Sequence, residues 1–318
     1  MILVLRALGV GDLATAVPAL RGLRAAFADH PLVLAAPGWL EPMVDLVGGI
    51  DRVVRADGLD PFDWPGTQPY WAVNLHGRGP RSHRLLQGAE PVLLRAFACP
   101  EAGHTDGPAW VDDEHEVHRW CRLLDWYGVP CDPADLGLRL PEPHRLGIGL
   151  TLLHPGGKDA RRRWAPDRFA AVARELTRLG HRVLVTGSTA ERDLVRHVVE
   201  SAGLPATSAL AGHLDVRELA ALVGYGRLVV SADTGIAHLA TGYGTPSVVI
   251  FGPVRPDHWG PPPDRPWHRA LWAADLAGAA GEPGTIHPAL AAVDVRQVLT
   301  AADDAERAGR SRDAVAAH

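Results

Sequence analysis

Short apolar runs that end in glycine-containing loops recur along this chain of 318 residues. Residues 2–5 form the first run, within a strand expected at residues 2–6, and residues 148–153 and 228–231 repeat the pattern in the second half. After the first run, apolar residues continue at helical spacing from Leu13 to Phe27. A short continuous apolar run is typical of a strand buried on both faces, and alternation of such strands with helices favours a parallel sheet. The chain is therefore predicted to be a doubly wound α/β protein.

The same reasoning assigns the other elements. Asp215, with Glu218 three residues later, has the spacing of a capping box and predicts the start of a helix. From Ala301 onward the chain is rich in Ala, Asp and Arg, and we expect these residues to fray. Further strands are expected at residues 32–36, 53–54, 71–75, 182–186 and 247–251, and helices at residues 111–127, 169–179 and 191–199.

Residues 140–144, which read Leu-Pro-Glu-Pro-His, are the best candidate for a linker, because two prolines interrupt any periodic pattern. A chain of this length also exceeds what one hydrophobic core comfortably serves. We therefore predict two domains, residues 1–143 and residues 144–318, the second with a C-terminal helix. Ligands of doubly wound sheets bind at the carboxyl ends of the strands, so we expect the glycine-marked loops to line a cleft between the domains.

Composition excludes several classes of protein. The net charge of −5 with His neutral argues against broad nucleic-acid binding. Arg6 interrupts the first apolar run, so a signal peptide is not expected, and the absence of a long uncharged apolar window allows at most peripheral membrane contact. Three cysteines, Cys99, Cys121 and Cys131, are too few for a disulfide framework and favour the cytoplasm.

The first loop contains Gly9, Gly11 and Asp12 and matches the dinucleotide pattern G-x-G-x-x-A. We reject dinucleotide binding here, because an aspartate in the loop would repel a pyrophosphate and the next strand ends without the acid that would hold a ribose. Asp12 has two readings that the spacing leaves open. It is either an N-cap, or an ionised carboxylate that accepts a proton from a hydroxyl.

The second loop, residues 154–164, joins two glycines to four cations within six residues. Backbone amides and cations together suit a diphosphate, whereas the alternative is a solvated charge run before a helix. The residues that would bind the diphosphate are Gly156, Gly157, Lys158, Arg162 and Arg163. Thr186 and Gly187 end the next expected strand and lie at the same expected edge of the sheet.

The third loop places Asp233 at the end of a strand, with Thr234 and Gly235 at the start of the next helix. His238 follows one helical turn after Thr234, so the two can face the same side. The alternative reading is an N-cap aspartate and a core histidine. Of the ten tryptophans, Trp164 and Trp259 are the two that we expect near the cleft.

The sequence lacks the motifs of a zinc helix, a nucleophile elbow and a P-loop. His115 and His118 lack the i, i+4 spacing of a zinc helix, and the G-x-S-x-G and G-x-x-x-x-G-K-[ST] patterns are absent from the sequence.

Four segments carry a family resemblance: Asp12 in its glycine loop, HPGG with the basic run and Trp164, SADTGIAHLA, and FGPVRPDHWGP. In this order they resemble glycosyltransferase family 9, the ADP-heptose:lipopolysaccharide heptosyltransferase-like enzymes, from residue 2 to about residue 300. The resemblance implies a GT-B fold, in which two Rossmann-like doubly wound domains face each other across a cleft. It also implies an inverting enzyme that moves a sugar from a nucleotide-diphosphate donor to a hydroxyl acceptor, with neither a metal nor a cofactor.

The resemblance further implies roles for single residues. Asp12 is the general base in an acceptor-binding N-terminal domain, and the C-terminal domain binds the donor. Arg162 or Arg163 neutralises the diphosphate, while Asp233 orients the loop or a sugar hydroxyl. The remaining candidates are Gly156, Gly157, Lys158, Thr186, Gly187, Thr234, Gly235 and His238 for the donor, and Gly9, Gly11 and His76 on the acceptor side.

An ADP-sugar, with heptose as the first candidate, is the favoured donor, and the acceptor is a saccharide, a lipid-linked glycan or a natural product. Two alternatives stay open. A sugar-nucleotide epimerase of the same fold would draw on His76, Glu101 and His104, and a non-catalytic module would bind a nucleotide sugar without turnover.

Overall fold

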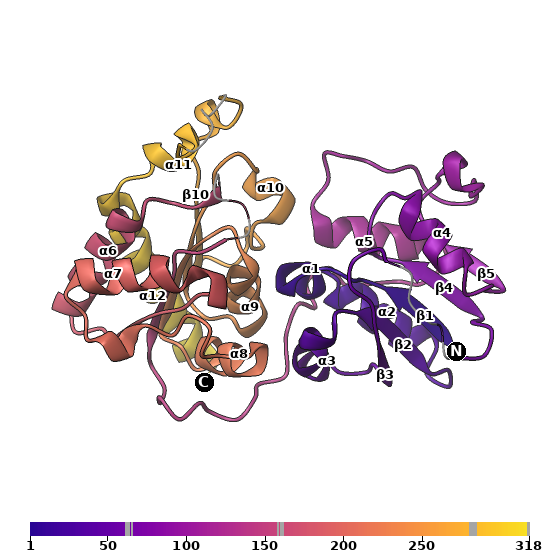
Figure 1. Cartoon of the computed structure of the whole chain (residues 1–318), viewed down its shortest axis with the longest axis horizontal. Helices are drawn as coiled ribbons and strands as arrows, with labels where there is room; N and C mark the ends of the chain where they lie inside the picture. The colour runs from indigo at the N-terminus through magenta and orange to yellow at the C-terminus, as the bar shows by residue number, and fades with distance from the viewer. Residues whose placement is uncertain (61–63, 65, 158, 160–161, 280–284, 317–318) are drawn as a thin grey trace. The chain divides into compact units, whose positions relative to one another are not determined.

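The structure is a computed structural model that describes residues 1–60, 64, 66–157, 159, 162–279 and 285–316. The chain separates into two compact units, Met1–Arg139 (unit 1) and Leu140–His318 (unit 2). The division falls just before the boundary expected after Pro143, at the start of the proline-containing segment. Each unit has a parallel five-stranded sheet of its own (Figure 1).

The sheet of unit 1 has the strand order β3-β2-β1-β4-β5, and all its pairs are parallel. Continuous apolar runs form its centre, because a central strand is covered on both faces. The strands are β1 (Ile2–Leu5), β2 (Leu32–Ala36), β3 (Arg52–Arg55), β4 (Trp71–Asn74) and β5 (Leu93–Arg95). The α-helices are α1 (Val10–Thr15), α2 (Val17–Ala26), α3 (Glu41–Val47), α4 (Arg81–Gln87) and α5 (Glu116–Trp126).

Two helices of unit 1 differ from the prediction. The apolar stripe from Leu13 to Phe27 is divided between α1 and α2, because Ala16 (φ −90°, ψ −4°) ends the first helix and Pro18 occupies the first turn of the second. The helix expected over residues 111–127 begins later, at Glu116, where the ring of His115 accepts a hydrogen bond from Val117 N at 3.2 Å.

The sheet of unit 2 has the order β10-β9-β8-β6-β7 and is also parallel throughout. Asp215 is the N-cap of α8 and Glu218 completes the capping box, as predicted. The strands are β6 (Thr151–His154), β7 (Val183–Val185), β8 (Leu228–Ala232), β9 (Ser247–Ile250) and β10 (His268–Leu271). The α-helices are α6 (Pro166–Arg178), α7 (Arg192–Ala202), α8 (Val216–Gly224), α9 (Gly235–Tyr243), α10 (Pro256–Trp259), α11 (Pro288–Ala292) and α12 (Val295–Ala316).

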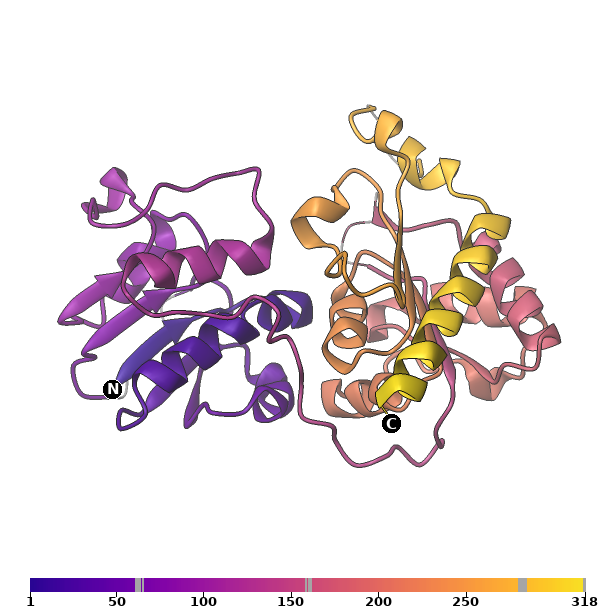
Figure 2. The same cartoon turned by 180° about the vertical axis from the view of Figure 1, so that it is seen from behind.

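The expectation that residues from Ala301 onward fray is wrong. They belong to α12, which packs against α6, β9 and β10 and is the long yellow helix in Figure 2. Ala301 and Ala305 are buried, and Glu306 accepts from both Arg227 Nε and Nη2, at 2.5 and 3.2 Å. A stripe of small apolar residues therefore fixes a helix whose other faces are charged.

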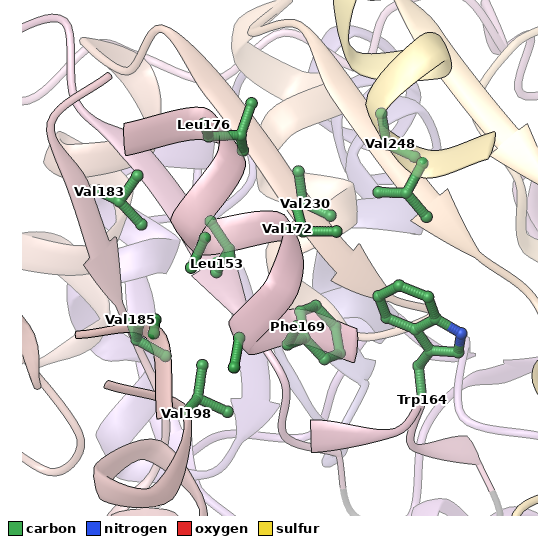
Figure 3. Close-up of a cluster of buried hydrophobic side chains, with 14 of the residues drawn as sticks. Leu153, Trp164, Phe169, Val172, Leu176, Val183, Val185, Val198, Val230 and Val248 are labelled. Atoms are coloured by element: carbon green, nitrogen blue, oxygen red, sulfur yellow. The ribbon is translucent and has the colours of Figure 1, made fainter. Parts of the chain in front are cut away.

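Trp164 and Phe169 lie in the main core of unit 2, where α6 covers β6 and β8 (Figure 3). The two rings meet edge to face at 5.1 Å between centroids. Trp164 is 1% exposed, and its indole N–H donates to Val293 O at 3.0 Å. Trp164, which the sequence placed near the cleft, thus has a structural role: it anchors the end of the second loop in the core of unit 2. None of the helices in the described ranges has both the length and the apolar character that a bilayer crossing requires.

His268 makes the stability of unit 2 depend on pH. Burial lowers its pKa to about 3, helped by the nearby charges of Arg265 and Arg312, and its Nδ1 is 2.8 Å from Ser247 Oγ. Since an unfolded histidine binds a proton near pH 6.5, the stability contributed by neutral His268 is complete above that pH and is lost as pH falls toward about 3.

We expect His268→Gln to reduce the acid dependence of the unfolding free energy by up to about 1.4 kcal/mol per pH unit below pH 6.5. Urea unfolding at pH 6.5 and pH 5 measures this slope. His197→Gln is the control, because the side chain of His197 is 52% exposed. Equal slopes in the parent and in His268→Gln would contradict the prediction.

Candidate functional site

The first glycine loop of unit 1 joins β1 to α1 and presents Asp12 in the first turn of the helix. Asp12 Oδ2 accepts a hydrogen bond from Gly9 N at 3.0 Å, so the carboxylate closes its own loop as the N3 residue of a capping box. Its side chain is nevertheless 29% exposed. Asp12 is therefore the N3 residue of α1 and not its N-cap. Its partly exposed carboxylate is still able to accept a proton. Gly11 lies inside α1, next to Asp12.

Arg6 ends the first apolar run, and its side chain is fully buried behind Asp12. Its Nε donates to Asp12 O at 2.9 Å, and its Nη2 lies 3.1 Å from Glu116 Oε1 and 3.7 Å from Asp12 Oδ1. The guanidinium carbon stands 4.7 Å from the centroid of the Trp120 ring. The buried guanidinium of Arg6 is therefore shared between the carboxylates of Glu116 and Asp12.

His76 follows β4, next to the first loop in the sheet. Its backbone N–H donates to Asn74 Oδ1 at 3.0 Å, and within the described ranges its buried Nδ1 has no hydrogen-bond partner. Burial, and then the charge of Arg6, lower the pKa of His76 to about 4, while Asp12 acts in the opposite direction. The imidazole is therefore neutral near pH 7 and offers a donor and an acceptor.

The epimerase candidates Glu101 and His104 serve other contacts. His104 Nε2 lies 3.2 Å from Ala96 O and 3.3 Å from Tyr127 Oη, in a structural cluster of unit 1. The pKa of the Glu101 carboxyl is lowered mainly by a hydrogen bond from its own backbone N–H.

In unit 2 the second loop follows β6, and the amide of Gly157 in this loop is already engaged. Gly157 N donates to Glu191 Oε1 at 2.7 Å, and Glu191 Oε2 accepts from Ser188 N at 2.7 Å and Ser188 Oγ at 2.9 Å. A Cβ at Gly156 would overlap the Glu191 carboxylate. The expectation of an open amide at Gly157 is corrected accordingly: Glu191 uses this amide to tie the second loop to the loop after β7.

Glu191 remains ionised in this position. Burial opposes ionisation, but the hydrogen bonds from Ser188 and Gly157 outweigh it and hold the pKa of the carboxyl below its ordinary value. Beside it, burial lowers the pKa of His154, whose Nδ1 is 2.9 Å from Thr186 Oγ1. Thr186 is 1% exposed, and Gly187 packs against Val195. Both residues therefore support the loops after β6 and β7 from their buried side.

Both arginines of the second loop have acidic or backbone partners. Arg162 pairs with Asp233, which joins the second and third loops. Arg163 Nε donates to Gly157 O at 2.8 Å, and its Nη2 is 3.7 Å from Glu191 Oε1. The side chains of Arg162 and Arg163 are each 35% exposed, so both can still meet an anion. Lys158 lies outside the described residues.

The third loop joins β8 to α9 and places the start of that helix beside the second loop. Thr234 is the N-cap residue, and no side chain in the described part of the chain caps α9. A Cβ at Gly157 would be 3.4 Å from Thr234 Cγ2, so the second and third loops are in contact range. Gly235 begins the helix, and its first amides and partial positive charge suit an anion.

His238 stands one turn further along α9, where its ring meets Trp259 edge to face at 5.9 Å between centroids. Trp259 belongs to α10, in the segment that follows β9. The aromatic contact therefore brings the fourth motif to the carboxyl end of the sheet of unit 2.

Sequence reasoning missed Arg6 and Glu116 in unit 1 and Glu191 in unit 2 as parts of the two sites. Ser188-Thr-Ala-Glu191 is a capping-box pattern, so a local signal for Glu191 existed. A charged residue directly after a fully apolar strand was the signal for Arg6. In the described ranges, no group of three or more His, Cys, Asp or Glu side chains is placed to hold a metal ion.

Comparisons with known proteins identify relatives of this chain. The sequence profile of Glycosyltransferase family 9 (heptosyltransferase) matches residues 112–273. Lipopolysaccharide heptosyltransferase 3 of Escherichia coli is 28% identical over 135 residues, which cover 41% of this chain and 38% of that protein. Lipopolysaccharide heptosyltransferase 1 of Pseudomonas aeruginosa is 29% identical over 223 residues, covering 66% and 56%. The chain thus matches about half or less of the length of these relatives.

Solved structures share the fold over nearly the whole chain. A glycosyl transferase family 9 protein from Veillonella parvula superposes with a TM-score of 0.78 at 20% identity, covering 96% of this chain and 97% of that one. The E. coli ADP-heptose LPS heptosyltransferase II gives 0.74 at 17% identity, covering 96% and 98%. The fold is GT-B, with a parallel-sheet α/β domain in each unit, as predicted. With the family profile matching half of its length, the chain belongs to glycosyltransferase family 9.

Proposed function

We propose that this protein transfers a sugar from a nucleoside-diphosphate donor to a hydroxyl group, with inversion at the anomeric carbon and without a metal ion. The observation that carries the proposal is that the candidate base and the candidate anion-binding groups belong to different units. Unit 1 presents the partly exposed carboxylate of Asp12, whereas unit 2 presents the uncapped start of α9 beside Arg162. A base and a diphosphate site kept on separate units avoid mutual repulsion.

In this proposal the diphosphate binds at the start of α9, through the amides near Gly235 and the hydroxyl of Thr234. Arg162 or Arg163 adds the cation that stabilises the leaving group. Asp12 accepts the proton of the acceptor hydroxyl as its oxygen attacks the anomeric carbon, and the bond from that carbon to the diphosphate breaks with inversion. Neutral His76 is a further group for holding the acceptor.

An ADP-sugar is the proposed donor, and ADP-heptose is the first to test, since the E. coli relative of known structure is described as an ADP-heptose enzyme. The acceptor is proposed to be a saccharide, a lipid-linked glycan or a natural product. We also propose a cytoplasmic location, which the three free cysteine thiols support.

Donor choice is tested by incubating the chain with ADP-, GDP-, UDP- and TDP-sugars and an acceptor panel, and measuring the released nucleoside diphosphate. Release that depends on the acceptor and persists in EDTA is expected. A reaction without any acceptor would favour an epimerase, and tight binding without turnover would favour a non-catalytic module. Either result would overturn the transferase proposal.

Nucleotide binding gives a second test. We expect ADP to raise the melting temperature more than GDP, UDP or TDP, with about 2.7 kcal/mol of stabilisation at a concentration 100 times the Kd. Gly156→Ala should abolish this gain, because its Cβ would displace Glu191 and the second loop. Gly278→Ala is the control, since a Cβ there meets no atom within 4 Å. Equal ADP stabilisation in both variants would contradict the placement of the donor.

A further inference from the structure

The side chain of Arg6 contacts residues well beyond the first loop of unit 1. Besides Asp12 and Glu116, its guanidinium donates to Leu75 O and to Thr15 Oγ1, the latter at 3.2 Å. These partners come from the loop after β4, from α1 and from α5, three segments that are distant in sequence. A planar fork with five N–H donors serves such a divergent set, whereas an ammonium group is a single point charge.

Glu116 is held equally firmly on the other side of Arg6. Its Oε2 accepts from Arg119 Nε at 3.0 Å, and its Oε1 accepts from Trp120 Nε1 at 3.0 Å. The carboxylate would therefore keep charged and neutral donors if Arg6 were replaced. A fully partnered buried network of this kind is rigid, and here its outer end is the carboxylate of Asp12.

We propose that Arg6, anchored by Glu116 and Trp120, is a positioning residue that fixes the Asp12 carboxylate in the first turn of α1. The fixing of Asp12 follows from contacts to its backbone oxygen and its carboxylate. The importance for catalysis rests on the proposed function, in which Asp12 is the base. A base held in one place needs no reorganisation when the acceptor arrives.

Two groups near Asp12, the amide of Gly9 and the ring of His76, allow the positioning role of Arg6 to be measured without any substrate. Gly9 N donates to Asp12 Oδ2, so exchange of this amide reports whether the carboxylate stays in place. The charged groups that act on His76 are Arg6, from the end of β1, and Asp12, from α1. The titration of His76 therefore reports the charge of Arg6.

The experiment uses the full chain with Arg6→Met, Arg6→Lys and a control, Arg21→Met, which removes a half-buried arginine of α2 that pairs with Asp135. In Arg6→Met, NMR titration of the His76 ring, assigned with His76→Gln, should show its pKa raised by about one unit, a tenfold higher proton affinity. Exchange of the Gly9 amide should accelerate about tenfold. Arg21→Met should change neither.

Arg6→Lys separates charge from geometry and remains informative if Arg6→Met does not fold. The lysine keeps the charge but cannot reach the same set of acceptors, so His76 should still titrate close to the parent while the Gly9 amide exchanges faster. Unchanged Gly9 exchange in Arg6→Lys would overturn the proposal. If both reporters respond but no sugar is ever transferred, the positioning role stands and the proposed function fails.

Discussion

Replacing Asp12 with asparagine is expected to lower the rate of sugar transfer by about 10²–10⁴-fold, the range typical of losing a general base. Asparagine is nearly isosteric, and its side-chain oxygen can still accept the hydrogen bond that Gly9 N gives to Asp12 at 3.0 Å. The loop is therefore retained, while the group proposed to accept the proton of the acceptor hydroxyl is lost. The measurement is release of the nucleoside diphosphate in the presence of donor and acceptor.

A set of variants separates the catalytic role from the structural one. Asp12→Ala removes both the base and the hydrogen bond, so it should lower the melting temperature in addition to the rate. Glu41→Gln is the matched control, because Glu41 is an exposed acid in the first turn of α3. ADP binding should be unchanged in all three variants, since the donor residues lie in unit 2. Near-normal transfer by Asp12→Asn would show that Asp12 is a capping residue alone.

Replacing Trp164 with alanine is expected to destabilise unit 2 by about 3–5 kcal/mol. The side chain is 1% exposed, packs on Phe169, and donates to Val293 O, so alanine would leave a cavity and remove one of the two hydrogen bonds that this carbonyl accepts. Urea unfolding followed by far-UV circular dichroism measures the loss. Trp164→Phe should cost less, because most of the apolar surface is kept.

Trp126→Ala is the control for size and residue type, since Trp126 is 59% exposed on unit 1. Its unfolding free energy should stay within about 0.5 kcal/mol of the parent. If Trp164→Ala instead kept full stability and lost ADP binding, Trp164 would contact the donor and would not be a core residue.

The central strands were predictable because each is a continuous apolar run buried on both faces. The edge strands β5 (Leu93–Arg95) and β10 (His268–Leu271) were not, since edge residues are only partly covered and both strands contain arginine. In α12 the buried face consists largely of alanine, which a search for large apolar residues passes over. The fold class thus follows from the sheet centres. The edge strands β3 and β7 were expected as well, so among the described strands only β5 and β10 depended on contacts that local patterns do not encode.

The candidate site divides in a similar way. Asp12 and the loop around Thr234 stood out because glycine turns at strand ends mark ligand-facing edges. Arg6 and Glu116 are 110 positions apart, so no local pattern joins them. The engagement of Gly157 N by Glu191 also depends on a distant residue, whose own capping-box motif points only to a helix start.

Each unit closes its own sheet within one uninterrupted stretch of sequence, and α12 packs on strands of unit 2. A single crossover between Arg139 and Leu140 therefore exchanges a complete half without cutting a strand pair. Under the proposed function, chimaeras between family members joined at this point should combine the donor preference of one parent with the acceptor preference of the other.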